Sequence, residues 1–188
     1  SSYQVSFDRL NFSLASNQLA LTNAKISNLN GHQSKHNEPL NLEVPLLQVS
    51  GIDYRAAYSN NELYLDSIKI IKPELLFRRV EHVKSGKNHA KDIFTVINSI
   101  FNQVHIEKIS LEKGKTDVEI EVKKNQHQLY SKQLDLMISG ITLDTLSNLK
   151  VGYRSMLIVA DNYKGIFQDS SKTISVKQLS YSTTDKFI

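Results

Sequence analysis

The chain has 188 residues, no cysteine and a formal net charge of +4, with 40% hydrophobic and 22% charged residues. This length fits one ordinary domain or a segment of a longer repetitive protein, and it is enough to bury a sizeable core. The lack of cysteine excludes disulfides and thiolate metal sites, and no apolar run approaches the roughly 18 residues of a membrane helix. Basic residues are interspersed with acidic ones, as in 107–121, which is typical of a solvated strand face. We therefore expect no nucleic-acid partner.

The first half of the chain is predicted to form β-strands separated by turns. Apolar and polar residues alternate over 3–14 and again over 18–26, with a turn at Ala15-Ser16-Asn17 between them. Residues 31–39 have loop composition. Residues 42–49 form a predicted strand in which Pro45 indicates an edge position or a bulge.

The stretch that follows predicts further strands and helical structure. Residues 51–59 suit one helical turn, and strands are predicted at 62–71 and 74–80, separated by Lys72-Pro73. A longer helix is predicted at about 90–103, with Asn88 as a suitable N-cap. Its apolar residues recur at helical spacing and form one stripe, which we interpret as core and not as a membrane anchor. The stripe consists of Ile93, Phe94, Ile97, Ile100 and Phe101.

The strand pattern resumes after this helix. Strands are predicted at 104–111 and 115–122 with a turn at 112–114, and then at 128–139, 152–159, 166–170 and 173–182, with a helical turn at 143–149. Most of these strands have one apolar and one polar face, which is typical of antiparallel sheet. The predicted fold is therefore mainly β, an extended curved antiparallel sheet with one amphipathic helix and short helical turns. We expect 1–188 to be a single segment of a larger repetitive protein, with possible subunits 1–82 and 104–188 joined by the helix at 90–103.

One short strand phrase recurs along the chain. It appears at 5–12 as Val-Ser-Phe-Asp-Arg-Leu-Asn-Phe, at 104–111, at 174–181, and more loosely at 63–70. Each copy has two apolar residues two apart, then a polar pair, then two more apolar residues two apart. The polar pair shifts the alternation by one residue, which predicts a kink or bulge within a long strand. A chain that repeats such a unit builds an extended sheet and does not frame a catalytic pocket.

The residues that could carry chemistry do not form a recognisable site. His32 and His36 lie four apart in a loop, without a third ligand at a suitable spacing, so we expect no metal. Glu119 and Glu121 are spaced to share an exposed strand face among lysines, which favours a solvated face over a glycosidase pair. The chain has no nucleophile elbow, phosphate loop or His-Glu-x-x-His motif. We expect neither enzymatic activity nor a cofactor.

The apolar faces of the strands are the remaining candidate site. The sheet either folds on itself as a sandwich or curls into a trough that meets an apolar ligand, and the sequence leaves both possibilities open. The expected ligand-facing residues are Leu63, Leu65, Leu75, Phe77, Val118, Ile120, Val122, Leu134, Leu136 and Ile138. Arg78 and Arg79 either grip a phosphate headgroup at a strand end or straddle the sheet, with one of them covering its rim.

The stretch Leu65-Asp-Ser-Ile-Lys-Ile-Ile-Lys-Pro-Glu-Leu-Leu-Phe-Arg78 resembles the AsmA/TamB-like superfamily. Proteins of that family repeat an order of apolar alternation, Pro, more alternation, Arg, a Gly/Asn turn, an amphipathic helix and a further alternating strand that ends near Gly. The order is similar here over about 42–122, and the richness in Lys, Asn, Ser and Ile resembles Bacteroidetes-type members.

The resemblance implies a long curved sheet with an apolar groove, in a protein of the periplasm that is anchored at the inner membrane through a segment outside this chain. It also implies a non-enzymatic role in outer-membrane lipid transport or biogenesis, with a phospholipid or other acyl-chain ligand and envelope proteins as further partners. The alternative is a structural or adaptor β domain with a closed core that binds a protein through a strand edge. A carbohydrate-active β enzyme is a third possibility.

Overall fold

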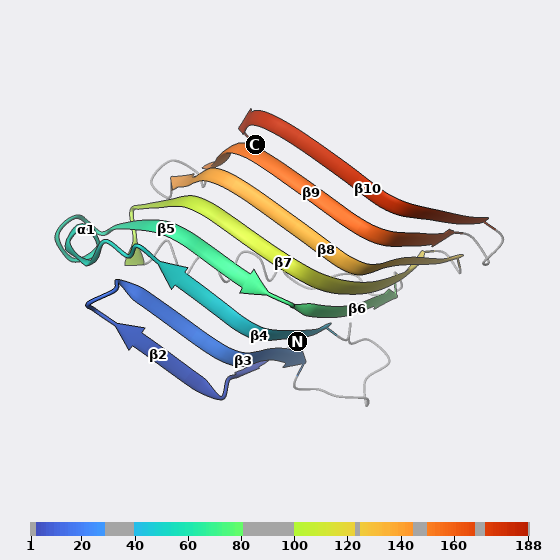
Figure 1. The fold of residues 1–188 in the computed structure, drawn as a ribbon, viewed down its shortest axis with the longest axis horizontal. Coiled ribbons are helices and arrows are strands. Elements are labelled where there is room, and N and C mark those ends of the chain that lie inside the picture. The colour runs from blue at the N-terminus through green and yellow to red at the C-terminus, as the bar shows by residue number, and fades with distance from the viewer. Residues whose placement is uncertain are drawn as a thin grey trace.

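A computed structural model describes residues 3–28, 40–80, 100–122, 125–144, 150–167 and 172–187. These residues form a ten-stranded sheet and one short helix, arranged as a single curved layer in which the long strands bend along their length (Figure 1). The helix is α1 (Tyr54–Asn60). The strands are β1 (Tyr3–Ser6), β2 (Arg9–Ser13), β3 (Gln18–Asn28), β4 (Leu40–Ser50), β5 (Glu62–Ile71), β6 (Glu74–Val80), β7 (Gln103–Val122), β8 (Asn125–Asp144), β9 (Lys150–Phe167) and β10 (Lys172–Phe187).

The strand order is β1-β3-β4-β5-β7-β8-β9-β10. Strand β2 also pairs with β3, and β6 pairs with both β4 and β7. The prediction of a mainly β fold with one helix is confirmed, but the sheet is mixed and not wholly antiparallel, because β5 and β6 run parallel to β7. Parallel neighbours need a crossover of about a dozen residues or more, and the stretch 81–102 is long enough to supply it.

Several predicted elements match the structure closely. The strands expected at 62–71 and 74–80 are β5 and β6. The helical turn expected within 51–59 is α1, whose N-cap Asp53 accepts a hydrogen bond from the Ala56 backbone N–H at 2.9 Å. The helix predicted at 90–103 lies mostly outside the described residues, and β7 already begins at Gln103.

Two predicted breaks between strands are wrong. The turn expected at 112–114 is a bulge inside the continuous strand β7, where Lys113 has a φ of 56° and its N–H donates to Asp135 Oδ1 at 2.7 Å. The strands expected at 152–159 and 166–170 are not separated by a break, because β9 continues through Asn162, at a φ of 50°, to Phe167. Residues 168–170 lie outside the described residues. A bulge and a tight turn both use left-handed backbone, so the local sequence does not distinguish them. The helical turn expected at 143–149 is also wrong at its start, since Leu143 lies in β8, and 145–149 lie outside the described residues.

Backbone irregularities are aligned across neighbouring strands in two lines. The first kink line consists of Asp66, Glu107, Gly140 and Arg154, positions that the pairing registers of β5, β7, β8 and β9 skip. The second kink line consists of Asn23, Pro45, Lys72, Lys113 and Asn162. Four of these five residues have a positive φ, and Pro45, which lacks an N–H, is skipped in the pairing of β3 with β4.

The kinks keep the apolar side chains on one face of the sheet. Leu65 and Ile68 stand on opposite sides of the polar pair in β5, yet both contact the same hydrophobic cluster, and Ile106 and Ile109 do so in β7. In a regular strand, residues three apart would point to opposite faces. The kink predicted from the repeated phrase is therefore confirmed in these two copies.

The hydrophobic core is small and lies toward the α1 end of the sheet. It consists of Leu65, Val104, Ile106, Ile141 and Leu143, each 3% to 9% exposed. No large side chain among the described residues is fully buried, and these residues include no second sheet that packs on the first. The part of the chain that the structure describes is thus an open sheet and not a sandwich.

A candidate apolar ligand-binding face

Apolar side chains line up across the strands in two rows between the kink lines. The first row is Phe12, Leu19, Val49, Ile68, Ile109, Ile138 and Met156, each beside the next in the pairing register. The second row, which reaches β10, is Leu10, Leu21, Leu47, Ile70, Leu111, Leu136, Ile158 and Tyr181. Members of the two rows on one strand are two residues apart and share a face. We call the two rows together the apolar band.

The apolar band is longer, measured across the strands, than one lipid acyl chain. The second row crosses eight strands, and neighbouring strands lie about 4.8 Å apart, so the row spans roughly 34 Å. One lipid acyl chain spans half of a bilayer core, which is about 15 Å. The interior members of the band are partly buried, whereas Leu10, Phe12 and Tyr181 at its two ends are 51% to 53% exposed. The band therefore offers an apolar surface long enough for more than one extended chain.

The structure divides the ten predicted ligand-facing residues into groups. Leu136 and Ile138 belong to the apolar band, and Leu134 is the next residue on the same face. Leu63 and Leu65 lie at the core end, and Leu65 is itself part of the core and only 9% exposed, so it is not available to a ligand.

The other predicted residues lie beyond the second kink line. Phe77, Val118 and Leu129 are neighbours across β6, β7 and β8, and Leu75 and Ile120 are two residues from members of this group. The side chain of Val122 lies outside the described set. The sequence-based prediction contained only Leu136 and Ile138 of the apolar band and missed its members on every strand other than β8. Their alternation was visible, but only the pairing register shows which face of each strand joins the others.

The arginine pair does not sit where a headgroup on the apolar face would need it. Arg78 follows Phe77 in β6 and so lies on the opposite face, where its Nε is 3.2 Å from Glu119 Oε2. The Arg79 side chain lies outside the described set. A headgroup role for Arg78 toward a chain on the apolar band therefore has no geometric support.

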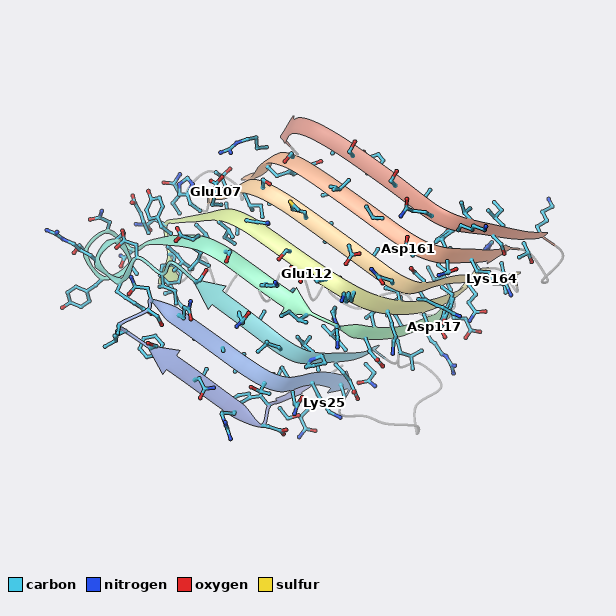
Figure 2. The ribbon with its side chains drawn as sticks, in the orientation of Figure 1. Lys25, Glu107, Glu112, Asp117, Asp161 and Lys164 are labelled. Carbon is cyan, nitrogen blue, oxygen red and sulfur yellow. The ribbon has the colours of Figure 1, made fainter. Side chains whose placement is uncertain are left out.

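The opposite face of the sheet is polar and carries cross-strand pairs. Figure 2 shows labelled charged side chains spread over β3, β7 and β9. Lys25 pairs with Glu43 at 3.1 Å and Lys69 with Glu112 at 2.9 Å, and Lys115 Nζ lies 2.6 Å from Glu74 Oε1. The hydrogen bond to Glu74 raises the pKa of Lys115. Such exposed pairs contribute little to stability because water screens them, but they keep this face solvated.

A shallow hollow of about 320 Å³ lies at the first kink line. It is lined by Tyr64 and His105, whose rings stack with centroids 4.8 Å apart, and by Arg154, which reaches across β8 to Glu107 at 3.2 Å. Gly140 of β8 also lines this hollow. Among the described residues, no three His, Cys, Asp or Glu side chains come together to hold a metal ion.

Comparison with known proteins does not identify a family. No protein-family model matches the chain, and no curated protein matches it. Within the described ranges, no helix has the length and apolar character needed to cross a membrane.

Proposed function

We propose that this chain is a non-enzymatic segment of an envelope protein that holds or conducts lipid acyl chains along its apolar face. The observation that carries the proposal is the apolar band, in which every strand from β2 to β9 except β6 contributes an apolar side chain to each of the two rows. The interior members of the band are only partly buried by the rest of the protein, and a contiguous apolar patch that stays accessible in a soluble protein usually binds something.

The band suits a hydrocarbon chain on physical grounds. Each methylene that moves from water onto an apolar surface contributes about 0.8 kcal/mol when it is fully buried. A chain that runs along the rows meets an apolar side chain about every 4.8 Å, with no polar group in the interior of either row. On the other side of the sheet, Met137 and Leu157 are neighbours but are flanked by Ser110 and Ser182, so the apolar side chains there form no continuous row. The apolar band is therefore the face that suits a hydrocarbon chain.

The cellular setting rests on the resemblance to the AsmA/TamB-like superfamily. That resemblance supports residence in the periplasm, in a parent protein anchored at the inner membrane, with phospholipid as the ligand and envelope proteins as further partners. The open sheet and its apolar band are compatible with such a role.

Two neighbouring residues of β4 provide a matched test. Leu47 is partly buried in the second row, and Gln48 is exposed on the polar face. The protein is purified without detergent and examined by native mass spectrometry and lipid extraction. We expect bound phospholipid at a stable stoichiometry in the wild type and in Gln48→Asp, and its loss in Leu47→Asp with an unchanged circular dichroism spectrum.

Two results would refute the proposal. One is a ligand-free mass together with no uptake of a fluorescent acyl chain by the wild-type protein. The other is equal lipid retention by Leu47→Asp and Gln48→Asp, which would place the lipid away from the apolar band.

The second candidate function is an adaptor that binds a protein through a strand edge. It is favoured by β10, a 16-residue strand whose only strand partner among the described residues is β9. Such an edge presents a row of backbone groups to an incoming strand. A lipid-free protein that captures an extended peptide would support this function instead.

A further inference from the structure

The sheet has an exposed edge at residues 3–14, which we call the first edge. Strands β1 and β2 lie end to end along β3, and no other described strand pairs with either of them. Five apolar side chains of this edge are 50% to 67% exposed, namely Val5, Phe7, Leu10, Phe12 and Leu14. An edge of this kind can extend the sheet by pairing with another strand.

The kink at Asp8 restricts which strand can pair there. The apolar residues of the first edge occupy positions 3, 5 and 7 before the kink and 10, 12 and 14 after it. The backbone is held at this point by the Asp8 N–H, which donates to Thr22 O at 3.0 Å, and by Asn23 Nδ2, which donates to Asp8 Oδ2 at 2.7 Å. A regular strand would match one half and place its apolar residues on the wrong face in the other half. The partner strand therefore needs the same break in alternation.

A second copy of the first edge has this break in the required place. If two copies run antiparallel about a two-fold axis between Asp8 and Arg9, apolar residues oppose apolar ones and polar residues oppose polar ones. The opposed pairs are Tyr3 with Leu14, Gln4 with Ser13, Val5 with Phe12, Ser6 with Asn11, Phe7 with Leu10, and Asp8 with Arg9. Each pair occurs twice, and a self-complementary contact of this kind closes as a dimer.

Charge complementarity distinguishes the first edge from the other end of the sheet. At its centre Asp8 opposes Arg9 of the second copy, and Arg9 opposes Asp8, so two pairs of opposite charge meet. In β10 the same phrase at 174–181 is also symmetric about its centre, but Lys177 would oppose Gln178 there, with no ion pair. We propose that this chain forms a homodimer by antiparallel pairing of residues 3–14, which joins two sheets into one.

The expected interface is small. Twelve residues of each copy span roughly 41 Å and form about ten backbone hydrogen bonds. Interfaces at the small end of the range are weak, so we expect a dissociation constant on the order of micromolar. The two central charge pairs are exposed, so dimerisation should weaken as salt is added.

Charge reversal gives a test with an internal control. Asp8→Arg and Arg9→Asp each replace two opposite-charge pairs by two like-charge pairs, and each should weaken the dimer at least tenfold in sedimentation velocity. Mixed in equal amounts, the two variants restore opposite charges at both central pairs, so the mixture should form dimers that neither variant forms alone. Lys177→Asp, the matched change in β10, should leave the dimer unaffected.

Each other outcome overturns the proposal. The proposal is wrong if the wild-type protein stays monomeric at hundreds of micromolar. It is also wrong if Asp8→Arg and Arg9→Asp each still form the dimer. Failure of the mixture to dimerise, with both variants folded by circular dichroism, would place the contact elsewhere, and loss of the dimer in Lys177→Asp would assign it to β10. The double variant with Asp8→Arg and Arg9→Asp exchanges the charges but loses the hydrogen bond from Asn23 Nδ2 to Asp8, so it should dimerise more tightly than either single reversal.

Discussion

Ile106 and Ile70 carry the same side chain in two environments that the structure distinguishes. Ile106 is 8% exposed within the core, whereas Ile70 is a partly buried member of the apolar band. Truncation to Ala removes three carbon atoms in each case. If the sheet is open, these two truncations should have very different effects on stability.

The expected costs follow from burial. At Ile106, three carbons at about 0.8 kcal/mol each give about 2.4 kcal/mol, and the cavity left among the buried neighbours raises the cost to about 3.5 kcal/mol. Ile70 is only partly buried, so its truncation loses roughly half of the 2.4 kcal/mol that burial of three carbons contributes, about 1.2 kcal/mol. No sealed cavity forms there because the face is open.

Urea unfolding followed by circular dichroism measures both costs. With a slope of about 2 kcal/mol/M, the unfolding midpoint should fall by about 1.8 M for Ile106→Ala and about 0.6 M for Ile70→Ala. Equal shifts at the two sites, each near the larger value, would refute the reasoning, since Ile70 would then lie in a closed core and the apolar band would not be free to bind a ligand.

Two further predictions concern the first kink line and its surroundings. Gly140 has a φ of +61°, and a Cβ there would lie 2.9 Å from the Arg154 Cβ. Gly140→Ala should therefore destabilise the protein by about 1–2 kcal/mol in the same urea assay. An unchanged unfolding midpoint would contradict the claim that a side chain at this position is strained. The hydrogen bond from the Tyr64 hydroxyl to Glu62 raises the pKa of Tyr64 above its ordinary value near 10. Its contribution to stability is therefore fully present below pH 10 and is lost as the pH rises through the folded pKa. Ultraviolet titration should show Tyr64 ionising at lower pH in Glu62→Gln than in the wild type, and identical titrations would contradict the assignment.

The elements that the sequence predicted well are those with local signals. Alternation bounded by Lys72-Pro73 placed β5 and β6, and the break in alternation at 63–70 and 104–111 predicted the kinks. Asp53 could be placed as a cap on α1 only once the helix was seen, although a helical turn was expected there. These features depend on neighbouring residues along the chain, so they can be predicted without knowledge of strand pairing.

The pairing of strands is not a local property, and the structure alone decided it. The parallel pairing of β5 with β7 brings Ile68 beside Ile109, and the rows across β3, β4 and β9 depend on the same registers. The candidate site was therefore only partly predictable, since each strand showed an apolar face but not which strands lay beside it.

The sequence by itself determined that this protein is a sheet of amphipathic strands with kinks, because alternation of side chains along a strand follows from backbone geometry. Only the tertiary structure decided that the described strands form one open layer with a small core at one end and a continuous apolar band beside it. The physical reason is that hydrogen bonds between strands join residues far apart in the chain, and their register determines which faces become neighbours.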